Sequence, residues 1–238
     1  MSVRRVVGTS LVAAAVFSAA PVWAGGHYVV KPAELVEPRS GELAFWQEER
    51  RNDVKSQGTF GRLTFRRNAP RQYTLELGSE GTRAEFPEAS SRSTFYVEGK
   101  HLFRQMHHHG YGFGVLLGAD YNITDRYREE VVLLFPLSMP LGERTRLHLN
   151  VGGEHDRVID ETESVWGVAL ERDIGRRWEF VLAAAGNSDS DREHFGQAGL
   201  RLRLMDDLMT LSFTYGTEFD SDSEDISYLG LTLDGLRF

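Results

Sequence analysis

The sequence predicts an all-β fold, a single antiparallel up-and-down transmembrane β-barrel of about 12 strands (10–12). The prediction rests on two-residue alternation, on the length of the alternating runs and on an N-terminal export signal. In residues 111–122, YGFGVLLGADYN, apolar side chains from Tyr111 to Tyr121 share one face, and glycines, Leu116, Asp120 and Asn122 share the other. A membrane barrel turns its apolar face to lipid and keeps the small and polar face inside.

The first 24 residues predict export. MSVRR is a basic start, an apolar run follows, and VWA ends at Ala24 as a small-residue cleavage site. The run is shorter than the roughly 20 residues of a spanning helix, and no later stretch approaches ~18 apolar residues free of charge. We therefore expect residues 1–24 to be a signal peptide, 25–40 a periplasmic N-terminal lead-in that looks unstructured, and 41–238 the barrel.

The expected strands are runs bounded by turn residues. Most of them match the ~9–11 residues of a membrane-crossing strand better than the ~5–6 typical of globular sheets. They lie at 41–50, 58–67, 71–79, 93–104, 110–121, 127–136, 144–154, 163–172, 177–187, 194–204, 208–219 and 226–236.

The connections between these runs tend to alternate in length. NAP, DIGR and MDD are short, whereas RNDVKSQ, HDRVIDET, SDSDRE and DSDSED are longer. Outer-membrane barrels have short periplasmic turns and longer outer loops, so both termini are expected in the periplasm and the acidic loops outside. Aromatic residues near strand ends are candidates for interfacial girdles: Tyr121, Tyr127, Trp166, Trp178 and Phe219.

Composition excludes several classes of function. The full chain has a net charge of −8, and removal of residues 1–24 with Arg4 and Arg5 makes it more acidic, which argues against nucleic acid as a partner. The chain contains no cysteine, so disulfides and thiolate metal sites are excluded.

The signal peptide, the alternating strands, the acidic loops and the terminal YLGLTLDGLRF resemble small Gram-negative outer-membrane β-barrels. The resemblance is to the porin-like type, which includes uncharacterised proteins and proteins assigned to the MetA pathway of phenol degradation. It covers most of residues 41–238 and is one of pattern. It implies a place among outer-membrane lipid and lipopolysaccharide, and recognition by the barrel-assembly machinery through Tyr228 and Phe238.

The terminal strand departs from the pattern. Leu229, Leu231 and Leu233 share one parity, whereas Leu236 and Phe238 take the other. Either the DG pair at 234–235 kinks the strand or the terminal signal is imperfect.

The inward face is the expected functional surface, and its charges must be paired or hydrated. Either they cross-link into a closed plug, or they line a narrow wet path for small polar solutes. Inward glycines at 112, 114, 118, 152, 167, 199 and 216 leave room, which favours a channel. The candidate lumen-lining residues are Arg62, Arg66, Glu76, Glu98, Lys100, Arg104, Asp120, Arg128, Glu130, Arg146, His148, Asn150, Glu154, Glu171, Glu179, Arg201, Arg203 and Glu218.

No catalytic or metal site is expected, and no cofactor. His148 and Asn150 lack the nearby serine that an outer-membrane hydrolase requires, and the charged GEHDR rim around His155 is more typical of a solvated loop. His107, His108 and His109 point in different directions on an extended chain, so a polar turn is favoured over a metal site. SDSDRE and DSDSED lack the glycine and distal glutamate of an EF-hand.

The sequence therefore predicts an integral outer-membrane barrel, most simply a narrow porin-like channel for small polar solutes and not an enzyme. One alternative is a closed structural or surface-interaction barrel without transport. Another is a soluble periplasmic ligand-binding barrel. The first two require hydrocarbon to contact Leu200, Leu202, Phe213 and Leu231.

Overall fold

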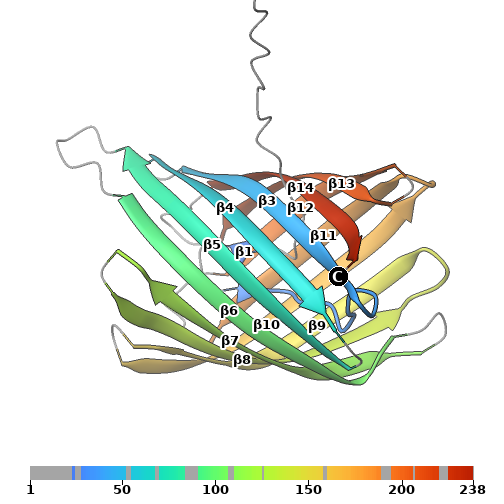
Figure 1. Cartoon of the computed structure of the whole chain (residues 1–238), viewed down its shortest axis with the longest axis horizontal. Coiled ribbons are helices and arrows are strands. Elements are labelled where there is room, and N and C mark those ends of the chain that lie inside the picture. The colour runs from blue at the N-terminus through green and yellow to red at the C-terminus, as the bar shows by residue number, and fades with distance from the viewer. Residues whose placement is uncertain are drawn as a thin grey trace, which may run out of the picture.

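Long antiparallel strands form one closed barrel (Figure 1). The computed structural model describes residues 23–24, 28–51, 55–67, 70–83, 91–106, 110–124, 126–157, 160–188, 194–205, 207–219 and 225–237. Twelve of its strands, β3 to β14, make the barrel, each hydrogen-bonded to the next in sequence. Within these ranges no helix is long and apolar enough to cross a membrane.

The barrel strands follow the predicted runs closely. They are β3 (Ser40–Arg51), β4 (Lys55–Arg66), β5 (Arg71–Arg83), β6 (Ser91–Arg104), β7 (Gly112–Asn122), β8 (Tyr127–Pro140), β9 (Thr145–Asp156), β10 (Glu161–Ile174), β11 (Trp178–Asn187), β12 (Phe195–Leu204), β13 (Met209–Glu218) and β14 (Asp225–Arg237).

The barrel closes where β14 pairs with β3, from Asp225 opposite Arg51 to Arg237 opposite Ser40. Closure gives every strand two neighbours, which a sheet needs in hydrocarbon because no water is present to satisfy an open edge. The predicted twelve-stranded, all-β, antiparallel barrel is therefore confirmed.

The two faces of the strands carry the predicted kinds of side chain. On β7, Leu117 is 57% exposed on the outer face, whereas Leu116 beside it is fully buried inside. Phe213 and Leu200 are exposed on the outside as well. Leu231 faces outward but is covered, because its register partners Leu211 and Phe45 flank it. The outer surface is thus an apolar belt.

A β-bulge resolves the change of parity in the last strand. The register of β14 with β3 shifts between Leu233 and Leu236, and Gly235 between them has a φ of 69°. Positive φ is available to glycine without strain, and a bulge moves the following side chains to the other face. The DG pair therefore kinks the strand, as one of the two explanations predicted.

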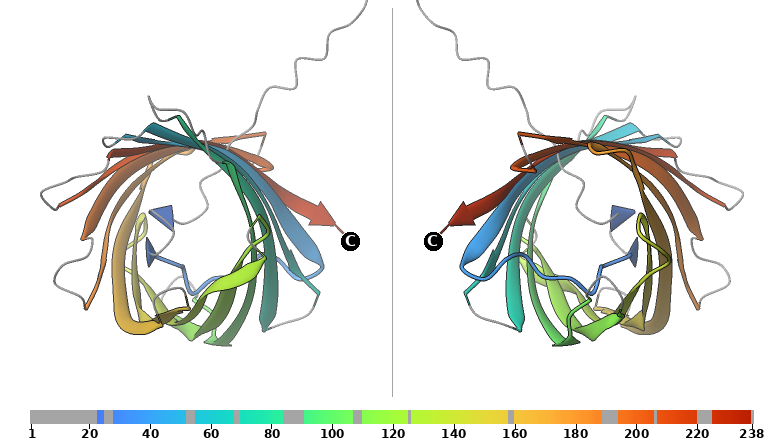
Figure 2. Two further views of the ribbon diagram at one scale, coloured as in Figure 1. Left: turned by 90° about the vertical axis from the view of Figure 1, so that its left-hand side faces the viewer. Right: turned by 90° about the vertical axis from the view of Figure 1, so that its right-hand side faces the viewer.

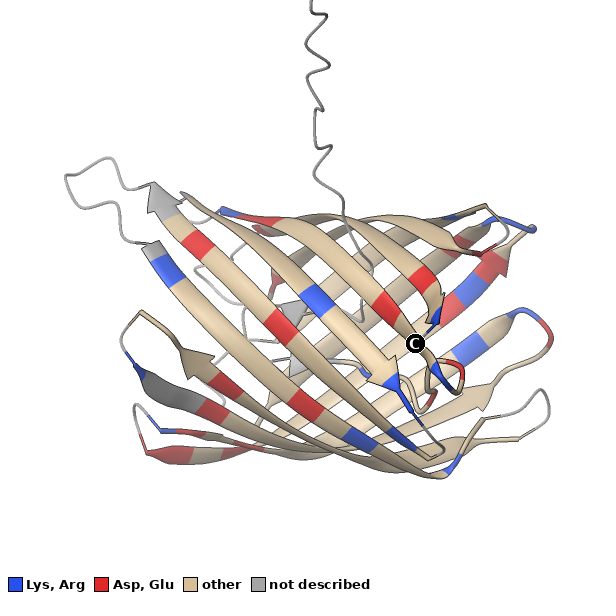
Figure 3. Cartoon of the chain, viewed as in Figure 1, with Lys and Arg blue, Asp and Glu red and all other residues tan. Residues whose placement is uncertain are grey.

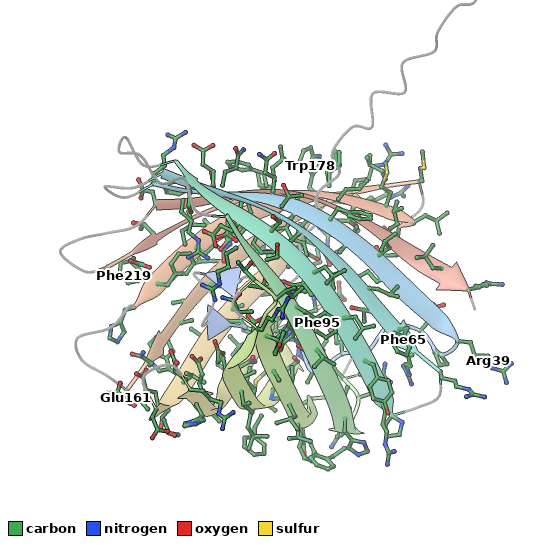
Figure 4. All side chains as sticks on the ribbon, turned by 60° about the vertical axis from the view of Figure 1, so that its left-hand side comes forward. Arg39, Phe65, Phe95, Glu161, Trp178 and Phe219 are labelled. Carbon is green, nitrogen blue, oxygen red and sulfur yellow. The ribbon has the colours of Figure 1, made fainter. Side chains whose placement is uncertain are left out.

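The barrel has two ends, here called the turn end and the loop end. The turn end carries connections 67–70, 105–111, 141–144, 175–177 and 205–208; the loop end carries 52–54, 84–90, 123–126, 157–160, 188–194 and 219–224. Figure 4 shows Arg39 and Phe65 at the turn end, and Glu161 and Phe219 at the loop end. The predicted contrast in length is weaker than expected, because strands extend into RNDVKSQ and HDRVIDET from Lys55 and Glu161.

Aromatic side chains are exposed on the outer face near both ends. Trp166 and Phe219 lie toward the loop end, and Trp178 toward the turn end. At the turn end the rings of Phe103 and Phe113 have centroids 5.5 Å apart. Such bands suit the interfacial regions of a bilayer. The Tyr127 side chain lies outside the described residues.

Replacement of Phe213 by arginine tests the outer belt. Phe213 lies midway along β13 and is 54% exposed, so the charge would enter hydrocarbon and should reduce folding stability by about 2–4 kcal/mol. Met205, 70% exposed in a turn, provides the matched control: Met205→Arg should cost about 0–1 kcal/mol. Urea unfolding from lipid vesicles measures both, and equal costs would contradict the membrane assignment.

Candidate functional site

A segment before the first barrel strand runs through the lumen. β1 (Trp23–Ala24) pairs with β2 (Tyr28–Val29), and β2 lies against β10 and β11 inside the ring of strands (Figure 2). Val30, Lys31 and Ala33 are 4%, 3% and 0% exposed. Residues 30–37, which we call the lumen segment, therefore occupy the barrel interior. Part of the lead-in expected over residues 25–40 thus lies inside the barrel.

One wall of the barrel holds the lumen segment by its main chain. The Lys31 N–H donates to Asn150 Oδ1 at 2.6 Å, and Asn150 Nδ2 donates to the Lys31 carbonyl at 2.9 Å. The Ala33 N–H donates to Ser138 Oγ at 2.6 Å. Asn150 and Ser138 are buried on β9 and β8, so an amide and a hydroxyl replace the strand partner that the segment lacks.

A neighbouring part of the wall, on β4 to β6, holds the rest of the segment in the same way. The Val36 N–H donates to Gln72 Oε1 at 2.9 Å, and Arg66 Nη1 donates to the Val36 carbonyl at 2.8 Å. Lys100 Nζ donates to the carbonyls of Pro32 and Glu34 at 3.2 and 3.3 Å. The segment thus runs from β10 and β11, where Val30 packs with Ala169 and Ala183, past β9, β8 and β6 to β5 and β4.

The Lys31 side chain adds an ionic contact to these main-chain bonds. Its Nζ lies 2.9 Å from Glu98 Oε2 and 5.9 Å from the centre of the Tyr96 ring. Tyr96 donates its hydroxyl to the same carboxylate at 3.1 Å. Burial lowers the pKa of Lys31 from 10.5 to about 8, and Glu98 opposes that shift. An ammonium group is therefore bound deep inside the barrel by a carboxylate and an aromatic face.

Inward glycines admit the segment and neighbouring side chains, and they leave less open space than the sequence suggested. A Cβ on Gly167 would lie 2.8 Å from Val30 Cγ2, and one on Gly112 would lie 2.7 Å from the Ala33 carbonyl oxygen. Tyr96 fills the space beside Gly118, and Phe195 fills that beside Gly216. The inward glycines therefore do not by themselves argue for an open lumen.

Gly167→Val should displace the lumen segment without disturbing the barrel ladder. The added side chain would overlap Val30, which packs there with Ala169 and Ala183. Gly99→Val is the control, because its Cβ would meet nothing nearer than a Tyr73 atom at 4.0 Å. We expect limited proteolysis to cut residues 30–37 at least several-fold faster in Gly167→Val than in Gly99→Val. Equal rates would show that Val30 does not lie against β10.

An ion-pair network covers the inner wall of β9 to β12 near the turn end. Glu179 contacts Arg146 at 2.5 Å, Arg201 at 2.6 Å and Arg203. Glu171 lies 3.1 and 2.8 Å from Arg146 and Arg201 and 3.2 Å from His148 Nε2, and Asp173 lies 2.6 Å from Arg203. His148 Nδ1 lies 2.7 Å from Ser138 Oγ, so the network reaches the group that holds Ala33.

A second polar group lies on β4 and β5. Arg62 donates to Glu76 through Nε and Nη2 at 2.9 and 2.6 Å, and its guanidinium lies 5.1 Å from the centre of the Trp46 ring. Thr64 and Thr74 share a hydrogen bond of 3.3 Å beside it. Figure 3 shows that such charged positions recur in the middle of strands as well as at their ends. In a membrane barrel, charges at mid-strand belong on the inner face.

Toward the loop end, the interior is lined by two separate apolar clusters. Leu116, Val132, Leu134, Val165 and Ala185 form one, on β7, β8, β10 and β11. Trp46, Phe195, Ile226 and Tyr228 form the other, with Phe60 packed against it; the Trp46 and Phe60 rings stack with centroids 5.2 Å apart. The clusters cover different parts of the wall.

The structure places most of the predicted lumen residues on the inner face. Arg62, Arg66, Glu98, Lys100, His148 and Asn150 are buried there, and most of them meet the lumen segment or the ion-pair networks. Asp120, Glu130, Glu154 and Glu218 lie on the inner face nearer the loop end.

Arg104 is the exception among the described residues. A bulge in the pairing of β6 with β7 between Leu102 and Arg104 breaks the alternation. The Arg104 guanidinium is exposed and lies 4.1 Å from the centre of the Tyr111 ring at the turn end. The prediction that Arg104 lines the lumen is therefore wrong. The side chain of Arg128, His107 to His109 and Phe238 lie outside the described residues.

The sequence was compared with models of known protein families. The model of the family described as "Uncharacterised conserved protein UCP029691" matches residues 12–234. The chain belongs to this family. No curated protein sequence matches this UCP029691 member.

Solved structures share the fold of this UCP029691 member at low identity. An outer membrane channel from Pseudomonas putida F1 is 10% identical, with a TM-score of 0.62, over 90% of this chain and 99% of that one. The NanC porin is 9% identical, with a TM-score of 0.58, over 80% and 98%. The KdgM porin in complex with disordered oligogalacturonate is 9% identical, with a TM-score of 0.54, over 80% and 98%. The fold is that of porin-like outer-membrane barrels, and these neighbours are channels and porins rather than enzymes.

Sequence reasoning missed the lumen segment of this UCP029691 member and some of its partners. Lys31, Gln72 and Ser138 were not among the candidates, because Gln72 and Ser138 carry no charge and Lys31 precedes the first strand. One signal was present: residues 28–36, YVVKPAELV, are richer in apolar side chains than a solvated leader requires.

Proposed function

We propose that this protein is an outer-membrane channel for small polar solutes and that the structure is its closed state, with the lumen segment as the obstruction. The observation that carries the proposal is the direction of the lumen contacts. The ion pairs between strands join neighbours or strands with a single strand between them, so they run along the wall. The lumen segment instead joins strands that face each other across the twelve-stranded ring, from β10 beside Val30 to β4, where Arg66 binds the Val36 carbonyl.

The obstruction can leave without opening the barrel. The strands are held by continuous ladders, whereas the lumen segment is held by the Lys31–Glu98 ion pair and by single side-chain hydrogen bonds that each contribute about 0.5–1.5 kcal/mol. The segment ends at Glu37, which is exposed, and the exposed residues Pro38 and Arg39 connect it to β3 at the turn end. A barrel with this segment withdrawn keeps its wall, its closure and its inner ion pairs.

The lumen surface that the segment covers is polar, which supports the transport of polar solutes. Withdrawal would expose Asn150, Gln72, Lys100, Arg66 and Glu98, which are amides and charges of both signs. Such groups within a low-dielectric wall bind and orient small polar molecules. The KdgM porin, whose structure holds an oligogalacturonate, is a barrel of the same fold with a polar ligand. The outer apolar belt and the predicted signal peptide support an outer-membrane location.

Solute influx tests the proposal. Residues 30–36 are replaced by a glycine–serine linker of equal length, and swelling of vesicles in sugars and amino acids is compared with vesicles that contain the intact chain. We expect slow swelling with the intact chain and at least tenfold faster swelling with the linker variant. If the linker variant folds, shown by heat-modifiable gel migration, yet behaves like protein-free vesicles, the barrel is structural and the channel proposal fails.

Alkaline pH should favour the closed state. The pKa of Lys31 is about 8 with the segment in place and returns toward 10.5 when the segment meets water. Between these values the closed state binds fewer protons, so raising the pH stabilises it; below pH 8 Lys31 is charged in both states and has no effect. Residual conductance should therefore fall between pH 8 and 10. The control Lys31→Met should remove this trend, and a rise of conductance in the intact chain alone would contradict it.

A further inference from the structure

We propose that the surface that holds the lumen segment is a binding site for an extended peptide, which takes the place of the segment when the channel opens. This inference rests on the proposed function and names a class of solute for it. The lumen segment is itself such a ligand, seated in the site.

The site recognises main-chain groups. Asn150 uses both atoms of its amide on Lys31, donating to the carbonyl and accepting from the N–H, as a neighbouring β-strand would. Ser138 and Gln72 accept the N–H groups of Ala33 and Val36. Three main-chain N–H groups and one carbonyl are thus held by neutral side chains.

Lys100 and Arg66 bind three further carbonyls. Lys100 donates to those of Pro32 and Glu34, and Arg66 to that of Val36. The five wall residues are 0–6% exposed with the segment in place, so its departure would leave the donors and acceptors that now bind it to water or to another ligand. Water could serve some of them, but an extended peptide offers the same alternation of donors and acceptors at the same spacing.

The site should bind peptides of many sequences, because most of its hydrogen bonds are to main-chain groups. The room beside Gly112 and Gly167 lets a chain approach the wall closely, and Ala169 and Ala183 accommodate a small apolar side chain where Val30 lies. The wall also binds one side chain of the segment by its charge, because Glu98 and Tyr96 hold the Lys31 ammonium. A peptide with a basic residue near its N-terminal end should therefore bind better than one without.

The test uses a barrel that is opened after it has folded. Exposed residues 37–39 are replaced by a specific protease site, the protein is folded into a planar bilayer and cut, and the freed segment is washed away. The probe is the peptide VKPAELV, a copy of residues 30–36, compared with a scrambled peptide that keeps its lysine at the second position. One control is the same peptide N-methylated at the alanine and at the final valine, which removes the N–H groups that Ser138 and Gln72 accept. The other control is a polyethylene glycol of similar mass.

We expect the copy and the scrambled peptide to block the current of the cut barrel with affinities within tenfold of one another. N-methylation should weaken the block by tenfold or more, and Asn150→Ala should weaken it similarly. Lysine-to-norleucine replacement in the peptide should weaken it less. Block by the copy alone would indicate a site fitted only to the chain's own segment and would overturn the inference, as would equal block by polyethylene glycol.

The two proposals fail differently. A cut and washed barrel that stays silent contradicts the channel itself. A cut barrel that conducts and ignores every peptide leaves the channel intact and overturns only the peptide site. If the cut segment does not wash out, displacement of a fluorescently labelled segment by added scrambled peptide supplies the same answer, and failure to displace it counts against the inference.

Discussion

Glu179→Gln should lower the free energy of unfolding by about 2–3 kcal/mol, somewhat less than the ~3–5 kcal/mol typical of breaking a fully buried ion pair. Glu179 is 2% exposed and contacts three guanidinium groups, those of Arg146, Arg201 and Arg203. The amide keeps the shape of the side chain but removes its charge. Three cations would then share the carboxylates of Glu171 and Asp173. The partial exposure of Arg146 and Arg203 provides hydration that reduces the cost.

A matched substitution separates this effect from charge removal in general. Glu49 pairs with Arg51 at 2.8 Å, but the Arg51 side chain is 67% exposed. Glu49→Gln should therefore cost about 0–1 kcal/mol. The double variant Glu179→Gln/Arg203→Gln should recover part of the loss because it restores the balance of charge. Urea unfolding in vesicles measures all three, and a Glu179→Gln cost no greater than that of Glu49→Gln would contradict the network.

Lys31→Glu should convert a nearly silent barrel into one that is open most of the time. The new carboxylate would lie beside Glu98, which is 3% exposed and now binds the Lys31 ammonium at 2.9 Å. Two like charges in a buried site cost several kcal/mol, which is comparable with the summed hydrogen bonds of the segment at about 0.5–1.5 kcal/mol each, so the equilibrium should shift toward the open state. The segment should leave the lumen, while the barrel ladder stays intact.

Single-channel recording measures this outcome. Lys31→Met is the control, since it keeps the length of the side chain and places no second negative charge beside Glu98; it should leave the barrel closed most of the time. Restoring attraction in Lys31→Glu/Glu98→Lys should close the barrel again. Open fractions that are the same in all three variants would show that the Lys31 contact does not hold the segment.

The fold could be read from the sequence because membrane strands obey a simple rule. Each outward position meets hydrocarbon, so the alternation of Leu117 with Leu116 and its neighbours is preserved along whole strands, and the strand length follows bilayer thickness. The rule fails at bulges. The bulge at Gly235 was indicated by the change of parity between Leu233 and Leu236. The bulge beside Arg104 left no such signal in the sequence, and it moved Arg104 from the predicted lumen to the rim.

The contents of the lumen could be predicted only in part. Inward charges were identifiable because lipid excludes them, but their partners depend on which strands approach across the interior. Glu179 meets Arg146 two strands away, a pairing that no local pattern encodes. The lumen segment was missed for a related reason: Asn150 and Gln72 gain their role from a chain segment about 119 and 36 residues away in sequence.

A cross-link tests most directly whether residues 30–37 occupy the lumen. The chain has no cysteine, so Ala33→Cys/Ser138→Cys introduces the only two thiols, at positions whose main-chain N–H and side-chain oxygen now lie 2.6 Å apart. Mild oxidation of the protein folded in vesicles should join the two thiols nearly completely and leave none for a membrane-impermeant maleimide. If both thiols instead stay free and react with the maleimide in the folded barrel, residues 30–37 do not close it.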